Sequence, residues 1–225
     1  MNALTIKARS AARRIGLLPL IQRLRSNGPY EREFGLALLG AIRPGDVVWD
    51  VGANIGLYTR QFIERAGSSG KVIAFEPEPA CYEILRRGCA QATLVNVALG
   101  ERAERGFIEF HNEPGNGSHC IVSQPNDSSN PVTIVRGDDY DGPCPNVMKI
   151  DVEGFEEEVL MGMPRILANL RLREIFLEVH FAQLEQRGKA TAPLRIEKML
   201  REHKFRTKWF RDRSHLQAIR HPSRS

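Results

Sequence analysis

The strongest constraint on the fold of this sequence is an alternation of helical patterns with short apolar runs. The helical patterns cover residues 31–42, 57–66 and 79–90, and the apolar runs that follow them cover 47–51, 71–75 and 93–97. Strands separated by helices of this length are joined by right-handed crossovers, which place the strands parallel in one sheet. We therefore predict an α/β fold with helices on both faces of a parallel sheet.

The alternation is interrupted at residues 101–145. This stretch contains three short apolar runs, at 106–110, 120–122 and 132–135, between loops rich in Asn, Ser, Pro and Gly. An insertion of this kind often supplies substrate contacts or a lid, and an irregular connection is the alternative.

The alternation then resumes in the last third of the chain. We predict a strand at 147–151, a helix at 153–170 with an apolar stripe from Phe155 to Leu170, and a strand at 174–180. A helix at 194–203 follows. Two final runs, 206–210 and 216–219, flank a polar segment and predict a closing antiparallel hairpin.

Length and composition predict one folded domain behind a short N-terminal segment. The chain has 225 residues, of which 42% are hydrophobic and 26% charged, so we assign residues 31–225 to one domain. Its four cysteines have the spacing of neither a zinc site nor a disulfide framework, which favours reduced thiols in the cytoplasm. No apolar run approaches the roughly 18 residues that a membrane span needs, so we expect a soluble protein.

Positive charge is concentrated at the two ends of the chain. Residues 1–26 hold six basic residues and no acidic ones, whereas residues 195–225 hold ten basic and three acidic ones. We interpret both ends as solvated faces, with a basic helical segment over residues 1–30, rather than as a nucleic-acid site. The apolar and basic residues at 4–25 are also compatible with weak contact between this segment and a membrane surface.

A glycine-rich turn follows the first predicted strand, in Asp50-Val51-Gly52-Ala53-Asn54-Ile55-Gly56. Its glycines permit a tight turn and close backbone approach, and the next helix presents free N–H groups to a ligand. Glu76 ends the second strand 20 residues after Gly56, where an acidic side chain can accept hydrogen bonds from a ribose. Because Asn54 replaces the second glycine of the dinucleotide fingerprint and the third is missing, a nicotinamide dinucleotide is disfavoured. The pattern indicates another nucleoside-containing cofactor.

Five blocks of this sequence, in order, resemble the FkbM family of methyltransferases over about residues 45–182. These blocks are Asp50–Gly56, Phe75–Pro79, Asn96–Gly100, Lys149–Glu156 and Leu177–His180. The resemblance implies the seven-stranded class I methyltransferase fold, with strand order 3-2-1-4-5-7-6 and the last strand antiparallel. It also implies S-adenosylmethionine as the cofactor.

The resemblance further implies which residues hold that cofactor. Around its methionine part would lie Asp50, Gly52, Asn54 and Gly56. Glu76 would hold the ribose hydroxyls, and Asn96 and Ala98 would lie near the adenine. An Asn at the end of a strand is also a common turn residue, which is the alternative for Asn96.

Three titratable side chains are placed together by the predicted strand ends. Asp151 and Glu153 follow a buried strand, with Glu153 beginning the next helix, and His180 ends the neighbouring strand. Methyl transfer to a hydroxyl requires that the acceptor oxygen be positioned and that a base receive its proton, and these three residues can supply both. His180 suits the role of base because imidazole titrates near neutrality. The alternatives are helix caps for the carboxylates and a hydrogen-bonded strand end for His180. Asp151 and Glu153 can also hold a divalent cation, but two carboxylates are weak evidence for a metal site, so we assign no metal.

These features favour an O-methyltransferase that acts on a hydroxyl of a sugar, a glycan or a polyketide-like small molecule, since the FkbM family is associated with such acceptors. RNA methylation, motivated by the basic ends, is the enzymatic alternative, and a nicotinamide-dependent oxidoreductase is a weaker one. His119, in the insertion, is a further candidate to face the acceptor, and the alternative is an exposed loop histidine without such a role. A binding module that keeps the fold without activity is the non-enzymatic alternative.

Overall fold

The computed structural model describes residues 29–109, 120–122, 129–211 and 214–220. The predicted basic segment over residues 1–30, with its possible membrane contact at 4–25, lies almost entirely outside the described residues. His119 and part of the insertion also lie outside them.

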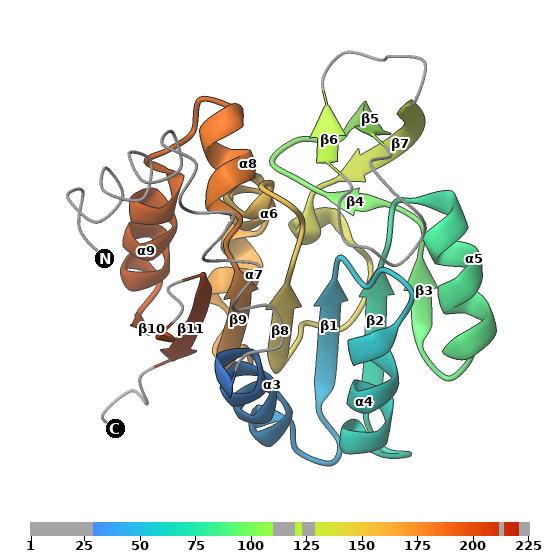
Figure 1. Cartoon of the computed structure of the whole chain (residues 1–225). Helices are drawn as coiled ribbons and strands as arrows, with labels where there is room; N and C mark the ends of the chain where they lie inside the picture. The colour runs from blue at the N-terminus through green and yellow to red at the C-terminus, as the bar shows by residue number, and fades with distance from the viewer. Residues whose placement is uncertain (1–28, 110–119, 123–128, 212–213, 221–225) are drawn as a thin grey trace.

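The main sheet has seven strands and contains every strand predicted outside the insertion (Figure 1). In chain order the strands are β1 Val47–Val51, β2 Lys71–Phe75, β3 Thr93–Val95, β8 Val147–Ile150, β9 Glu174–Glu178, β10 Phe205–Trp209 and β11 His215–Arg220. Their spatial order is β10-β11-β9-β8-β1-β2-β3. Strands β3, β2, β1, β8 and β9 are parallel, and β11 is antiparallel to both of its neighbours. This confirms the predicted 3-2-1-4-5-7-6 order and the closing hairpin.

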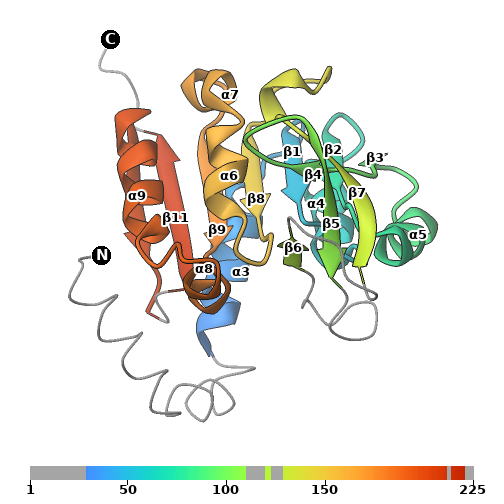
Figure 2. The same cartoon turned by 90° about the horizontal axis from the view of Figure 1, so that it is seen from above.

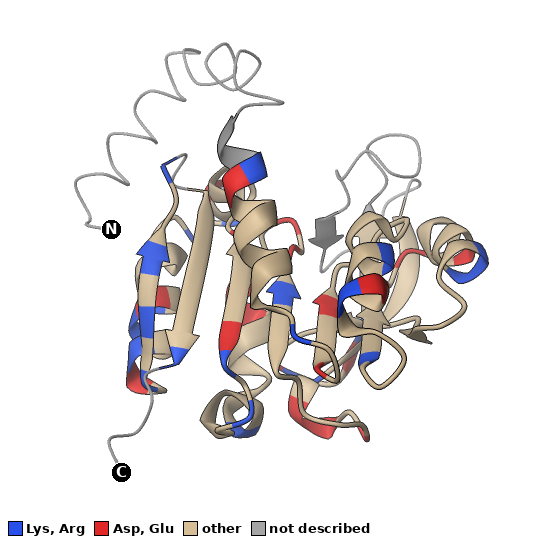
Figure 3. Cartoon of the chain, turned by 90° about the horizontal axis from the view of Figure 1, so that it is seen from below, with Lys and Arg blue, Asp and Glu red and all other residues tan. Residues whose placement is uncertain are grey.

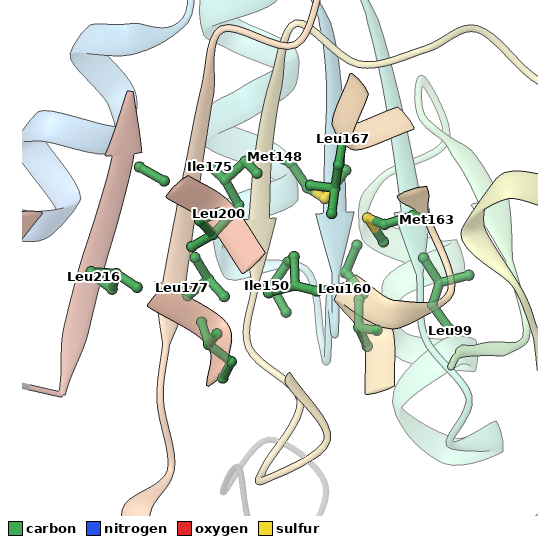
Figure 4. Close-up of a cluster of buried hydrophobic side chains, with 14 of the residues drawn as sticks. Leu99, Met148, Ile150, Leu160, Met163, Leu167, Ile175, Leu177, Leu200 and Leu216 are labelled. Carbon is green, nitrogen blue, oxygen red and sulfur yellow. The ribbon is translucent and has the colours of Figure 1, made fainter. Parts of the chain in front are cut away.

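Helices cover both faces of this sheet (Figure 2) because side chains along each strand alternate between the two faces. On β1, Trp49 and Val51 belong to the core beneath α6 and α9, whereas Val48 packs with Phe34 and Phe62 of α3 and α4. Figure 4 shows the first of these cores. The helices are α3 Pro29–Ala41, α4 Leu57–Ala66, α5 Pro79–Gly88, α6 Glu156–Met161, α7 Pro164–Ala168, α8 Phe181–Gln186 and α9 Ala192–Glu202.

The predicted helix at 153–170 is wrong as one element, because the structure divides it into α6 and α7. Pro164 begins α7, and proline cannot continue the preceding helix since it lacks an N–H. Between the helices, the backbone of Gly162 lies so close to Gly100 that a Cβ on Gly162 would lie 1.9 Å from the Gly100 carbonyl oxygen. Glu153 precedes α6 and has a φ of 49°, so it does not begin a helix.

The apolar stripe of this region is also shorter than predicted, because Leu167 is fully buried whereas Leu170 is 72% exposed. We therefore expect Leu167→Ala to lower the free energy of unfolding by about 2–5 kcal/mol, through lost burial and the cavity it leaves. The matched truncation Leu170→Ala should change it by less than about 0.5 kcal/mol. Urea unfolding measures both values, and equal losses would contradict this assignment of the core.

The insertion forms a second sheet, which lies beyond the carboxyl ends of β1 and β2 (Figure 1). Its strands are β4 Ala98–Leu99, β5 Glu104–Glu109, β6 Cys120–Val122 and β7 Ser129–Val135, in the spatial order β4-β7-β5-β6. The three predicted runs are thus strands. The predicted strand at 93–97 ends at Val95, however, because the chain leaves the main sheet there and pairs Ala98 with Ile134 of β7.

Basic residues of the C-terminal region lie on α9 and on the edge strand β10, as Figure 3 shows. Arg195 bonds to Glu157 with its guanidinium, and Arg201 lies 3.0 Å from Glu197. Part of this positive charge is therefore neutralised within the protein. In the part of the chain that the structure describes, no helix has both the length and the apolar character that crossing a membrane requires.

Candidate functional site

A cavity opens at the carboxyl ends of the central strands, between them and the second sheet. Ligands of open parallel sheets bind at this edge, where the strand order reverses. The cavity is lined by Val51, Gly52, Asn54, Phe75, Glu76, Pro77, Val97, Ala98, Leu99, Ile108, Asp151, Val152 and Glu153. Carboxylates and apolar side chains therefore line the same cavity. Ile108 of β5 is part of the insertion, so the insertion forms part of the cavity wall.

The glycine-rich turn follows β1 and is fixed to both neighbouring strands. The N–H groups of Gly52 and Ala53 both donate to the carbonyl of Phe75, at 3.0 Å. Gly52 has a φ of 78°, and a Cβ there would lie 1.8 Å from the carbonyl oxygen of Asp151, so only glycine fits. Gly56 lies farther along, where a Cβ would meet Leu85 of α5. Gly52 thus shapes the cavity, and Gly56 allows α5 to pack closely.

Glu76 presents a buried carboxylate to the cavity. One oxygen accepts the Asn54 N–H at 2.7 Å and the other accepts the Glu78 N–H at 2.8 Å, which fixes the side chain. The carboxylate retains lone pairs for a ligand, since each oxygen has two. Burial raises the pKa of Glu76 to about 7, although these two hydrogen bonds oppose the shift.

Three of the residues predicted to contact the cofactor, Asp50, Gly56 and Asn96, do not line the cavity. Asp50 is fully buried and accepts the Thr59 hydroxyl at 2.6 Å. Asn96 donates its side-chain amide to the carbonyl of Glu76 at 2.8 Å. Asp50 and Asn96 therefore support the loops that form the cavity. Ala98 lines the cavity, as do Gly52, Asn54 and Glu76.

His180 lies among carboxylates at the ends of β8 and β9. Its Nδ1 is 2.8 Å from Oε1 of the fully buried Glu156. Its Nε2 faces Oε2 of Glu153 at 3.4 Å, Oδ1 of Asp151 at 3.7 Å and Oε1 of Glu178 at 3.9 Å. The structure thus brings Asp151, Glu153 and His180 together as predicted, and it adds Glu156 and Glu178.

The titration of this group differs from the near-neutral histidine that we expected. Although burial opposes the charged form, the carboxylates of Glu156, Glu153 and Asp151 raise the pKa of His180 well above 6.5. Burial also raises the pKa of Glu153 to about 7, against the opposing effect of His180. With a proton on each ring nitrogen, His180 donates hydrogen bonds and has no lone pair with which to act as a base.

Residues 50–207 match the methyltransferase FkbM domain. Over 178 residues, the chain is 32% identical to the hexuronic acid methyltransferase AglP of Haloferax volcanii, a match that covers 76% of this chain and 67% of AglP. The chain belongs to the FkbM methyltransferase family.

Further curated relatives of this chain are also named as methyltransferases. Methyltransferase 1 of Beauveria bassiana is 28% identical over 142 residues, which are 51% of this chain and 57% of that protein. The matched part of this chain covers between 42% and 67% of the length of each of the three curated relatives.

Solved structures show the same class I fold. A methyltransferase FkbM from Methylobacillus flagellatus superposes with a TM-score of 0.54 at 14% identity, over 82% of this chain and 50% of that one. A ribosomal protein L11 methylase from Lactobacillus delbrueckii superposes with a TM-score of 0.50 at 12% identity, over 84% of this chain and 78% of that one.

In this FkbM-family chain, sequence reasoning missed Lys149. Its ammonium group is buried and lies 3.2 Å from Asp151, 3.5 Å from Asp50 and 3.4 Å from the carbonyl of Gly52. Burial opposes its charge, but the carboxylates of Asp151 and Asp50 raise the pKa of Lys149 above its usual range. Lys149 thus ties the glycine-rich turn to Asp151. A charged residue inside the apolar run 147–151 was the available signal.

Proposed function

We propose that this chain transfers a methyl group from S-adenosylmethionine to a hydroxyl of a sugar or glycan. The observation that carries the proposal is that one cavity is lined both by Glu76 and by Asp151 and Glu153. A carboxylate that can hold a nucleoside and carboxylates that can receive a proton therefore face the same cavity. The similarity to AglP, whose name states a hexuronic acid acceptor, supports a sugar acceptor.

The residues that line the cavity fit S-adenosylmethionine. Glu76 offers a preoriented carboxylate for the ribose hydroxyls, and Gly52 and Asn54 lie beside it in the turn. The apolar wall that suits an adenine comprises Val97, Ala98, Leu99 and Ile108. When bound, S-adenosylmethionine would supply an electrophilic methyl group on a positively charged sulfur.

The chain's own part in the reaction is to orient the acceptor and to receive its proton. Carboxylates of Asp151 and Glu153 line the cavity and can accept hydrogen bonds from sugar hydroxyls. We assign Glu153 as the base, which takes the hydroxyl proton onto a carboxylate oxygen. The hydroxyl oxygen of the acceptor would bond to the methyl carbon as the carbon–sulfur bond breaks, which would leave S-adenosylhomocysteine. The side-chain amide of Gln183 donates to Oε2 of Glu153 at 2.8 Å and so fixes the direction of the carboxylate. His180, which faces that same oxygen, positions it as well.

Replacing Glu153 with Gln tests this assignment. We expect kcat to fall by about 10²- to 10³-fold, because a positioned base typically contributes that much, while the affinity for S-adenosylhomocysteine stays within about twofold. Transfer of a labelled methyl group to a panel of uronic acids, neutral glycans, hydroxylated metabolites and RNA measures activity. Glu104→Gln, an exposed change on β5, is the control.

Two outcomes would contradict the proposal. An undiminished kcat in Glu153→Gln would exclude Glu153 as the base. Transfer to RNA, with none to any glycan or hydroxylated metabolite, would replace the proposed acceptor class with nucleic acid.

A further inference from the structure

We propose that His180, Asp151 and Glu178 form a binding site for one divalent cation beside the cavity. One ligand atom from each of these three residues lies within 4.8 Å of the other two. The residues come from the ends of the neighbouring strands β8 and β9, which hold them at fixed spacing. The site is independent of the identity of the methyl acceptor, and its test requires no catalytic activity.

The orientation of His180 is that of a metal ligand with a supporting carboxylate. Glu156, which is fully buried, holds Nδ1 at 2.8 Å and so fixes the ring. Binding of the cation releases the proton from Nε2 while Nδ1 keeps its own, so that the Nε2 lone pair becomes the ligand on the side that faces Asp151 and Glu178. Ligand histidines in metal sites almost always bond to a carboxylate, carbonyl or water through their second nitrogen in this way.

Each carboxylate presents one oxygen to Nε2 while a basic side chain lies beside its other oxygen. For Asp151, Oδ2 lies 3.2 Å from Lys149, and Oδ1 faces Nε2 of His180. For Glu178, Oε2 lies 3.5 Å from His215, and Oε1 faces Nε2. These facing oxygens lie 3.7 and 3.9 Å from Nε2, which is too long for hydrogen bonds. Small shifts would bring all three atoms to about 2.0–2.2 Å from one ion.

Charge and access agree with an ion at this position. Five carboxylates surround or adjoin the position, and three basic side chains face them. The carboxylates are those of Asp50, Asp151, Glu153, Glu156 and Glu178, and the basic side chains are those of Lys149, His180 and His215. The side chains of Asp151 and Glu178 are 28% and 35% exposed, so an ion can reach them from solvent. An imidazole with two carboxylates suits Mn²⁺ or Zn²⁺ better than Mg²⁺ or Ca²⁺, which prefer oxygen ligands alone.

Titration of the full chain with Mn²⁺, followed by the loss of the electron paramagnetic resonance signal of free Mn²⁺, tests the site. We expect one ion per chain, and a loss of affinity of at least tenfold in each of Glu178→Gln and His180→Gln. Glu156→Gln should weaken binding by about 10- to 100-fold without removing a ligand, since it only orients His180. Glu174→Gln, at the other end of β9, is the control and should bind as the unaltered protein does.

Two outcomes of these titrations would overturn the proposed cation site. No stoichiometric binding of Mn²⁺ or Zn²⁺ by the unaltered protein would overturn the proposal. Binding that survives His180→Gln but not Asp151→Asn would also overturn it, because the ion would then have oxygen ligands only. Circular dichroism checks that each variant folds, and where Glu178→Gln does not, Asp151→Asn replaces it.

Discussion

Replacing Glu76 with Gln should weaken the binding of S-adenosylhomocysteine about a hundredfold. The carboxylate accepts one N–H on each oxygen, from Asn54 and from Glu78. A Gln side chain has the same shape, but its NH₂ group would face one of these donors and could not accept from a ribose hydroxyl. Hydrogen bonds to charged groups contribute roughly 1.5–3 kcal/mol each, and the loss of one or two such bonds gives this magnitude. Isothermal titration calorimetry measures the affinity.

The pH dependence of the same binding provides an independent measurement. Because the pKa of Glu76 is raised to about 7, its carboxylate takes up a proton as the pH falls through that value. Burial is the main cause, and the neighbouring carboxylates of Glu78 and Asp50 add to it. The ionised form is the better acceptor for ribose hydroxyls, so affinity in the unaltered protein should be about tenfold lower at pH 6 than at pH 8.

Two comparisons assign this pH effect to Glu76. In Glu76→Gln the affinity should vary much less with pH, since the titrating group is gone. Glu83→Gln, an exposed change on α5, should behave as the unaltered protein. A Glu76→Gln variant with unchanged affinity would mean that the cofactor does not contact this carboxylate.

Gly52→Ala should lower the free energy of unfolding by at least about 3 kcal/mol. The residue has a φ of 78°, which costs an alanine roughly 1–2 kcal/mol, and the added Cβ would lie 1.8 Å from the carbonyl oxygen of Asp151. That oxygen belongs to backbone at the end of β8, so it cannot move without disturbing the pairing of β8 with β1.

Urea unfolding of Gly52→Ala beside Gly40→Ala measures this effect. Gly40 lies near the end of α3, and a Cβ there meets nothing within 4 Å, so its replacement should stabilise the protein slightly. If Gly52→Ala proved as stable as Gly40→Ala, the close contact between the turn and β8 would not exist in solution.

Local sequence pattern was sufficient for the central strands of the fold. The runs 47–51 and 71–75 are apolar and are bounded by glycine or proline, and both coincide with β1 and β2. The division between α6 and α7 has a local signal in Pro164, which the predicted helix at 153–170 overlooked. The contact of Gly162 with Gly100, 62 residues earlier in the sequence, could not be predicted from local pattern. The short helix α8 was missed because six residues give too little periodicity.

The sequence likewise predicts some residues of the candidate site and not others. Glu76 was found because a fixed spacing after the glycine-rich turn has a chemical meaning. Lys149, Glu156 and Glu178 have roles that arise only from contacts between strands and helices distant in sequence. The sequence also presents His180 as an ordinary imidazole, because only the folded chain surrounds it with carboxylates.

The backbone contact between Gly100 and Gly162 limits how the insertion can be exchanged between family members. It joins the start of the second sheet to the break between α6 and α7, and the N–H of Asp138 donates to the carbonyl of Gly162 on the same side. A chimaera that replaces the segment from β5 to β7 but keeps residues 98–101 and 136–139 would preserve this attachment. Residues 98–101 and 136–139 are therefore the junctions at which the insertion can be exchanged while its attachment to the break between α6 and α7 is kept.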